Sequence, residues 1–160
     1  MGDHDEEATM DREDCRQVIL EAKRHKGLTF QALADQVGRH VVWTTAAIMG
    51  QATMEASEAE ALAGLLDLRG DVAAEVVEAL QEIPMKGSLD TDVPVDPLIY
   101  RLHEITQVYG TTIKAVIHEQ FGDGIMSAID FEIDIERIAD PKGDRVKLTY
   151  NGKFLPYRKW

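Results

Sequence analysis

Three polar residues in the second half of the chain have types and spacing suited to chemistry. Arg101 and Glu104 are three positions apart in the run YRLHE, and Ser127 follows the run GDG at residues 122–124. Residues three apart project from neighbouring points on one helix face. The Arg101 guanidinium could bind a small planar anion through two N–H donors. Glu104 could orient that guanidinium or exchange protons, and Ser127 could donate a hydrogen bond or act as a nucleophile.

Each of these residues also has an ordinary structural explanation. Arg101 and Glu104 could form a surface ion pair that contributes little stability. Ser127 could satisfy backbone N–H groups at the start of a strand, which is a common role for serine. The sequence offers no GxSxG elbow for a nucleophilic serine. The residues alone leave both explanations open.

Two helices are predicted to carry the first part of this region. Asp96 is a candidate cap with Pro97 at the first helical position, and Gly110 is placed to end the first helix. Thr111 is a candidate cap for a second helix, which Gly122 would end. Helical spacing turns one set of apolar residues of the first helix toward a core: Leu98, Ile99, Leu102, Ile105 and Val108.

About three strands are predicted to follow. Residues 125–138 alternate, with Ile129, Phe131, Ile133 and Ile135 on one face and Asp130, Glu132, Asp134 and Glu136 on the other. Residues 140–143 read as a turn, and residues 145–150 as a second strand. Asn151-Gly152 is a strong hairpin signal, after which residues 153–155 would return as a third strand.

The first half of the chain is predicted to be a helix bundle. Helical periodicity and caps indicate helices at about residues 14–27, 29–38, 40–49, 51–66 and 71–80, with Ser57 and Glu60 as a possible capping box. The predicted organisation is an acidic disordered tail over residues 1–12, the bundle over 13–86, a linker over 87–95 and a small domain over 96–160. The fold class is therefore α+β.

Charge and composition exclude several classes of function. The net charge is −12, and residues 1–86 carry 17 acidic against 8 basic residues, so general affinity for nucleic acid is not expected. No apolar run approaches the length of about 18 residues that spans a bilayer, so no membrane partner is expected. Cys15 is the single cysteine, and His103 and His118 lack metal-ligand spacing, so no metal site is predicted.

The segment YRLHEITQVYGTTIKAVIHEQFGDGIMSAIDF resembles the signature region of the cyanases, or cyanate hydratases, and GKFLPYRKW resembles their C-terminus. The likeness runs from about Asp14 to Trp160. It implies a bundle resembling phage-repressor DNA-binding domains but not used on DNA, and a C-terminal dimerisation and catalytic domain with intertwined strands. It also implies that Arg101, Glu104 and Ser127 are the catalytic residues.

The resemblance further implies an activity and an assembly. Cyanases are lyases that condense cyanate with bicarbonate, releasing carbon dioxide and carbamate, which decays to ammonia and a second carbon dioxide. The expected protein is a cytoplasmic homodecamer built from five dimers, with bicarbonate as second substrate and no metal or organic cofactor. The alternative from another class is a non-enzymatic regulator that binds DNA through a helix-turn-helix at residues 28–50, with the C-terminal half serving in oligomerisation.

Overall fold

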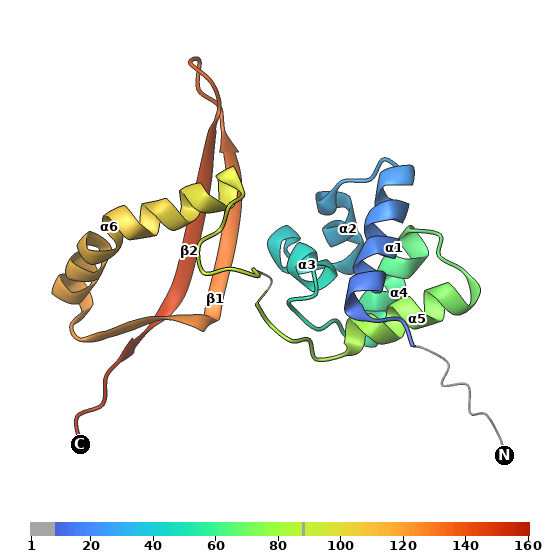
Figure 1. Ribbon diagram of the computed structural model, residues 1–160, viewed down its shortest axis with the longest axis horizontal. Coiled ribbons are helices and arrows are strands. Elements are labelled where there is room, and N and C mark those ends of the chain that lie inside the picture. The colour runs from blue at the N-terminus through green and yellow to red at the C-terminus, as the bar shows by residue number, and fades with distance from the viewer. Residues whose placement is uncertain (1–8, 88) are drawn as a thin grey trace. The chain divides into compact units, whose positions relative to one another are not determined.

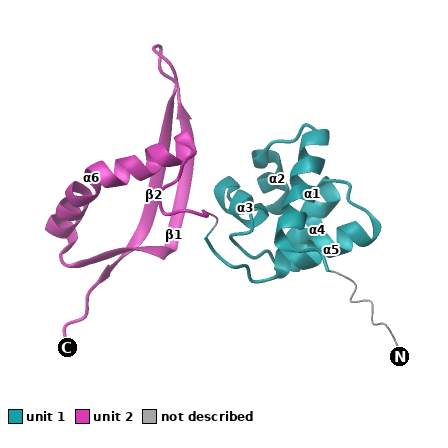
Figure 2. Cartoon of the chain, in the orientation of Figure 1, with its two compact units in different colours: residues 1–88 teal, residues 89–160 magenta. Residues whose placement is uncertain are grey.

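The computed structural model describes residues 9–87 and 89–160. The chain divides into two compact units, residues 1–88 and 89–160 (Figure 2). The boundary falls inside the predicted linker at residues 87–95. Most of the predicted acidic tail, residues 1–8, lies outside the described residues. Each unit is considered by itself below.

The described residues of the first unit form five helices joined by short loops, and the helices overlap those that the sequence predicts (Figure 1). They are α1 (Arg12–His25), α2 (Phe30–Val37), α3 (Val41–Ile48), α4 (Ala56–Leu65) and α5 (Gly70–Gln81). Thr29 caps α2 by accepting the Ala32 N–H, and Gly38 ends that helix with a left-handed φ of 78°, both as predicted. In this unit, residues that cap or end a helix therefore act on the backbone next to them, as the sequence predicts.

The core of this unit lies where the five helices converge. Its largest fully buried aliphatic side chains come from every helix: Ile19, Leu33, Ile48, Leu62, Val76 and Leu80. The Arg12 guanidinium at the start of α1 donates to the carbonyl oxygens of Ala47, Ala52 and Ala79 at 2.8 to 3.1 Å. These carbonyls lie at or just after the C-terminal ends of α3 and α5, so Arg12 brings an additional donor to the carbonyl ends of both helices.

The capping box of α4 lies two residues earlier than predicted. The Glu58 carboxylate accepts the Glu55 N–H at 2.9 Å, whereas the sequence suggested Ser57 and Glu60. Glu58 also accepts from Arg39 Nε at 2.5 Å, and only 7% of the residue is exposed. This long-range contact fixes Glu58 at the third position of the helix, which local sequence spacing does not reveal.

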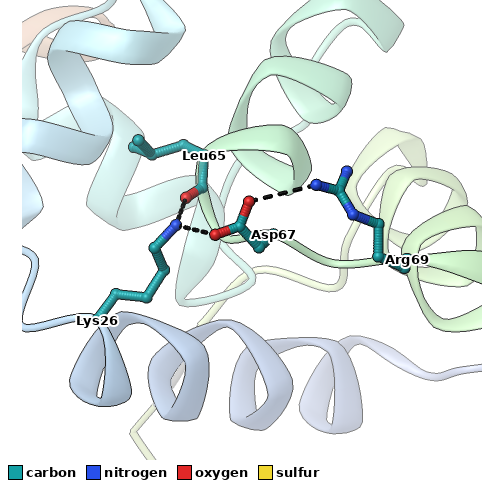
Figure 3. Close-up of polar contacts among 4 residues, drawn as sticks. All are labelled: Lys26, Leu65, Asp67 and Arg69. Carbon is teal, nitrogen blue, oxygen red and sulfur yellow. Dashed lines mark hydrogen bonds and ion pairs between the residues drawn. The ribbon is translucent and has the colours of Figure 1, made fainter.

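A second polar cluster joins the end of α1 to the turn between α4 and α5 (Figure 3). Lys26 Nζ donates to the Leu65 carbonyl at 2.6 Å and pairs with Asp67, which also lies 3.4 Å from Arg69. The Lys26 ammonium holds the pKa of Asp67 below its usual value. Asp67 has a φ of 55°, a conformation that aspartate tolerates better than most residues.

The second unit begins with one long helix, α6 (Pro97–Phe121), in place of the two that were predicted. Asp96 caps it as expected, accepting the Leu98 and Ile99 N–H groups at 2.9 and 3.0 Å. Gly110 does not end the helix, because one glycine inside a helix costs only about 1 kcal/mol and its neighbours continue the backbone hydrogen bonds. The helix ends instead at Gly122, whose φ is 91°.

Two antiparallel strands follow, where about three were predicted. They are β1 (Gly124–Ile138) and β2 (Arg145–Pro156), which form one long hairpin (Figure 1). The turn lies at residues 139–144, where a turn was expected, and Arg137 Nε pairs with Asp144 across it at 2.5 Å. Asn151 and Gly152 are not a turn but lie inside β2, opposite Glu132 and Phe131. The described residues confirm the α+β class.

The hairpin contains a large bulge at the start of β1. Met126 pairs with Phe154, but the next paired residue of β1, Phe131, lies opposite Gly152. Residues 127–130 therefore face a single residue of β2, Lys153. A Cβ at Gly152 would overlap the Ser127 carbonyl oxygen and lie 2.6 Å from the Met126 side chain. Gly152 is required here by this close backbone approach, and not by a hairpin turn.

The apolar surface of the second unit is largely uncovered by the unit itself. No residue of α6 is buried, and the face predicted to enter a core remains 36 to 70% exposed at Leu98, Ile99, Leu102, Ile105 and Val108. Ile129 is 97% exposed, because the bulge interrupts the predicted alternation of β1. A two-stranded hairpin beside one helix is too small to bury these faces by itself.

Candidate active site

Arg101 and Glu104 form an ion pair on the first turns of α6. Arg101 Nη1 lies 3.2 Å from Glu104 Oε2, and the two side chains are 67% and 45% exposed. The guanidinium carbon also lies 5.7 Å from the ring centre of Tyr100. An exposed pair of this kind contributes little stability. Glu104 nevertheless engages only part of the guanidinium, which has five N–H donors, so Arg101 retains the capacity to bind an anion.

Ser127 lies in the bulge and is 5% exposed. Its Oγ accepts the backbone N–H groups of Ile129 and Asp130, both at 3.0 Å. A serine hydroxyl has two acceptor lone pairs and one donor. Because both acceptor positions are engaged by N–H groups, the hydroxyl proton is left to donate. This geometry suits Ser127 to donating a hydrogen bond more than to acting as a nucleophile.

One chain does not assemble the three residues into one site. Among the described residues, no hydrogen bond or ion pair links Ser127 to Arg101 or Glu104. A surface depression is lined by Ala74, Val77, Glu78, Gln81 and Glu82 of α5, and contains none of the three. The candidate site residues thus occupy two separate places, the exposed start of α6 and the bulge of β1.

The histidines near these places have local partners. His118 Nε2 lies 3.2 Å from the Gly124 carbonyl oxygen and 3.3 Å from Lys114 Nζ, so it joins the end of α6 to the start of β1. The His103 ring lies 6.3 Å from that of Tyr100. Within residues 9–87 and 89–160, no group of three or more histidine, cysteine or acidic residues is arranged to hold a metal ion.

The helix-turn-helix region offers little for DNA. Arg39, the basic residue before α3, is bound by Glu58 and lies 5.5 Å from the Trp43 ring. Burial alone would raise the pKa of Glu58, but the Glu55 N–H and the Arg39 guanidinium together hold it below the usual value. The bound carboxylate is therefore ionised and neutralises the guanidinium that a phosphate would need.

The sequence did not reveal the bulge that holds Ser127. Alternation of apolar and acidic residues predicted an uninterrupted strand from residue 125, and Asn151-Gly152 was assigned to a turn. The signal that was available is the pair of glycines, Gly124 and Gly152, at which a Cβ would clash with the opposite strand. Glycine inside a strand often marks a bulge or a close backbone approach.

None of the helices formed by the described residues combines the length and apolar character needed to cross a bilayer.

Comparisons with known proteins identify the family of both units. The family model described as "Cyanate hydratase, N-terminal" matches residues 12–84, and "Cyanate lyase C-terminal domain" matches residues 91–159. A cyanate hydratase from Thiobacillus denitrificans is 55% identical over 151 residues, covering 94% of this chain and all of that relative. A cyanate hydratase from Parasynechococcus marenigrum is 56% identical over 143 residues, covering 89% of this chain and 95% of the relative.

A solved structure gives the same result at the level of the fold. The crystal structure of cyanase from T. urticae matches with a TM-score of 0.75 and 39% identity, covering 89% of this chain and 96% of that one. Both the helical bundle and the C-terminal unit match models of this family. The bundle is therefore a regular part of the family's architecture, and its presence gives no separate support to a DNA-binding regulator. Taken over both units, the likeness shows that the chain belongs to the cyanate hydratase (cyanate lyase) family.

Proposed function

We propose that this chain is a cyanate hydratase that decomposes cyanate with bicarbonate as second substrate. The observation that carries this proposal is the 55% identity to a cyanate hydratase along nearly the whole chain. The products are carbon dioxide and carbamate, and carbamate then decays to ammonia and a second carbon dioxide. The reaction needs no metal or organic cofactor, because bicarbonate itself supplies the attacking oxygen.

The proposed first step joins two anions. A bicarbonate oxygen attacks the cyanate carbon, and the cyanate nitrogen takes up the bicarbonate proton and one proton from solvent. The bond between that oxygen and the original bicarbonate carbon then breaks, and its electron pair stays on the oxygen. The bicarbonate carbon departs as carbon dioxide, and carbamate remains. Two unit charges 4 Å apart repel by about 1 kcal/mol in water and about 4 kcal/mol in a protein environment. The site must therefore supply positive charge and hydrogen-bond donors.

Three residues are proposed to meet that need. Arg101 binds and neutralises the anions through its unpaired N–H donors, and Glu104 fixes the guanidinium through their 3.2 Å contact. Ser127 donates its hydroxyl proton to an oxygen of the bound anion, a role supported by the two N–H groups that its Oγ already accepts.

The complete site is proposed to form at junctions between subunits of a homodecamer made of five dimers. Two observations support assembly: one chain leaves Ser127 and Arg101 unconnected, and α6 and the hairpin expose their apolar faces. Symmetry at such a junction can bring two Arg101 side chains to one dianionic intermediate. We further propose that the enzyme works in the cytoplasm and uses neither nucleic acid nor a membrane as partner.

Substitution of Arg101 tests the proposed site. Arg101→Leu is expected to lower ammonia release from cyanate by at least about a thousandfold, because the charge and the guanidinium N–H donors are lost, while the assembly keeps its mass. Arg101→Lys keeps the charge but loses the planar pair of donors, so intermediate activity is expected. Turnover and light scattering are measured on the same samples.

The matched control is Arg145→Leu, which removes an exposed arginine from the start of β2. It should keep activity within a factor of two. Near-normal turnover by Arg101→Leu would show that the assigned roles are wrong, even if the wild-type protein decomposes cyanate.

A further inference from the structure

Phe154 of β2 lies at the point where α6 meets the hairpin. Its ring centre is 5.2 Å from that of Phe121, the last residue of α6, and the two ring planes are tilted by 32°. The same end of β2 runs beside the start of β1, and the Tyr157 N–H donates to the Asp123 carbonyl oxygen at 3.1 Å (Figure 1). Tilted ring pairs at this separation are favourable and geometrically specific. The Phe154 ring therefore connects the end of the helix to both strands.

The same ring packs against the first residues of β1, on the near side of the bulge. A Cβ at Gly124 would lie 2.5 Å from the Phe154 ring and 2.4 Å from the Leu155 carbonyl oxygen, so the ring lies directly against the Gly124 backbone. Phe154 is paired with Met126, and this is the last regular pair before the bulge. Ser127 is the next residue of β1. Phe154 therefore lies where the regular pairing stops and the bulge begins.

The place of the Ser127 hydroxyl depends on the course of this bulge. Its Oγ accepts from the Ile129 and Asp130 N–H groups at 3.0 Å, and both of these residues belong to the bulge itself. The close approach of Gly152 limits the bulge on its far side, and the Phe154 pair limits it on the near side. Misplacing a catalytic group by about 1 Å can lower a rate about a hundredfold. A residue that fixes one end of the bulge can therefore affect catalysis without touching the substrate.

We propose that Phe154 is a positioning residue for Ser127. Its ring holds the start of β1 against the end of α6 through Phe121 and the Gly124 backbone, so that the Ser127 hydroxyl is directed at the bound anion. This inference rests on the proposed cyanate hydratase activity and on the donor role proposed for Ser127. Because such a donor acts most strongly on the charge of the transition state, loss of the Phe154 ring should lower kcat more than it raises KM.

The experiment compares variants of the full-length assembled protein. Phe154→Leu removes the ring from β2 and Phe121→Leu removes its partner from α6, so two different substitutions test one contact. Phe154→Tyr keeps the ring and should preserve function. The matched control is Tyr150→Leu, which disrupts the other aromatic pair of the hairpin, where the Tyr150 ring lies 5.6 Å from that of Phe131 beyond the bulge. For every variant we would measure kcat, KM for both anions, mass and thermal unfolding.

Hydrogen–deuterium exchange of a peptide covering residues 127–131 adds a measurement that does not depend on activity. The Ile129 and Asp130 amides donate to Ser127 Oγ, so their exchange reports whether the hydroxyl stays in place. Exchange in this peptide should be faster in Phe154→Leu than in wild type. It should be unchanged in Tyr150→Leu.

Phe154→Leu and Phe121→Leu are both expected to lower kcat about tenfold, equivalent to about 1.4 kcal/mol, with KM within a factor of about three. Phe154→Tyr and Tyr150→Leu should keep kcat within a factor of about three of wild type. The inference is overturned if Phe154→Leu keeps kcat within that factor. It is also overturned if Tyr150→Leu, at a similar loss of thermal stability, lowers kcat and speeds exchange as much as Phe154→Leu does.

An inactive wild-type protein would instead overturn the proposed function. The exchange comparison would then still test whether the Phe154 ring holds the bulge in place.

Discussion

The bulge gives Ser127 two defined backbone contacts. Its Oγ accepts from Ile129 and Asp130 at 3.0 Å, which leaves a single donor on a hydroxyl that is almost buried. From the sequence, a nucleophilic serine and a hydrogen-bonding serine could not be distinguished, because the distinction depends on where these two N–H groups point. The exposed Arg101–Glu104 contact, by contrast, follows directly from a spacing of three on a helix.

Glu58 shows the opposite case, a charged residue that serves the fold. It lies nearly buried between the Arg39 side chain and the Glu55 N–H. We predict that Glu58→Gln lowers the free energy of unfolding by about 1 to 3 kcal/mol at pH 7, because a charge-assisted bond is weakened. Urea unfolding at one fixed chain concentration measures the difference, and Glu60→Gln, on the exposed side of α4, is the matched control.

The effect of Glu58 should depend on pH with a definite sign. The folded state holds the pKa of Glu58 below the ordinary value of 4.5. Its stabilising contribution is therefore complete above that value and is lost as the pH falls through the lower folded pKa. The difference between wild type and Glu58→Gln should shrink below pH 4.5. A difference that grows on acidification would contradict the ionised pair.

Among the elements, the hairpin depends most on a single residue. Gly152 lies where a side chain would collide with the Ser127 backbone. Gly152→Ala is predicted to displace the bulge, lowering the free energy of unfolding by about 1 to 3 kcal/mol and turnover by more than tenfold. Thermal unfolding and kcat are the measurements.

Gly110→Ala provides a contrast on α6. The nearest atom outside its own helix backbone that a Cβ would meet is a Thr106 methyl group at 3.9 Å, an ordinary contact. Alanine should therefore stabilise the helix by about 1 kcal/mol. If Gly152→Ala were as stable and active as wild type, the bulge would not position Ser127 as described.

The elements were predictable where a signal acts on its own neighbours. Thr29, Gly38 and Asp96 produce the predicted helix ends because each contacts backbone within four residues. The predictions of a helix end at Gly110 and of a turn at Asn151-Gly152 were wrong, because the effect of these residues depends on the flanking and opposite segments. A glycine can continue a helix that both flanks support, and an Asn-Gly pair can lie within a strand when the opposite strand bulges over it.

At the scale of the molecule, the second unit exposes apolar surface that it cannot bury by itself. The sequence predicted a core face on α6, but the second unit leaves the residues of that face 36 to 70% exposed. Sequence periodicity indicates which face of a helix is apolar, but it does not identify the element that covers this face. For the same reason, the sequence did not show that Ser127 and Arg101 lie in separate places within one chain.

The proposed homodecamer predicts a specific mass. The purified protein should scatter light as a particle of ten 17.9-kDa chains. Ile105→Asp places a charge on the apolar face of α6 and should reduce that mass, since an unpaired charge is costly to bury. Gln107→Asp adds the same charge about 200° around the helix and is the control. A monomer of unchanged mass in all three proteins would refute the proposed assembly.

The most direct test of the central claim is ammonia release from cyanate, measured on the purified, assembled protein with and without bicarbonate. We predict one ammonia per cyanate when bicarbonate is present and almost none when it is removed, because bicarbonate supplies the attacking oxygen. Absence of release from folded, assembled protein would mean that the chain has the family's fold without its activity. Release that continues without bicarbonate would contradict the proposed mechanism, even though cyanate is the substrate.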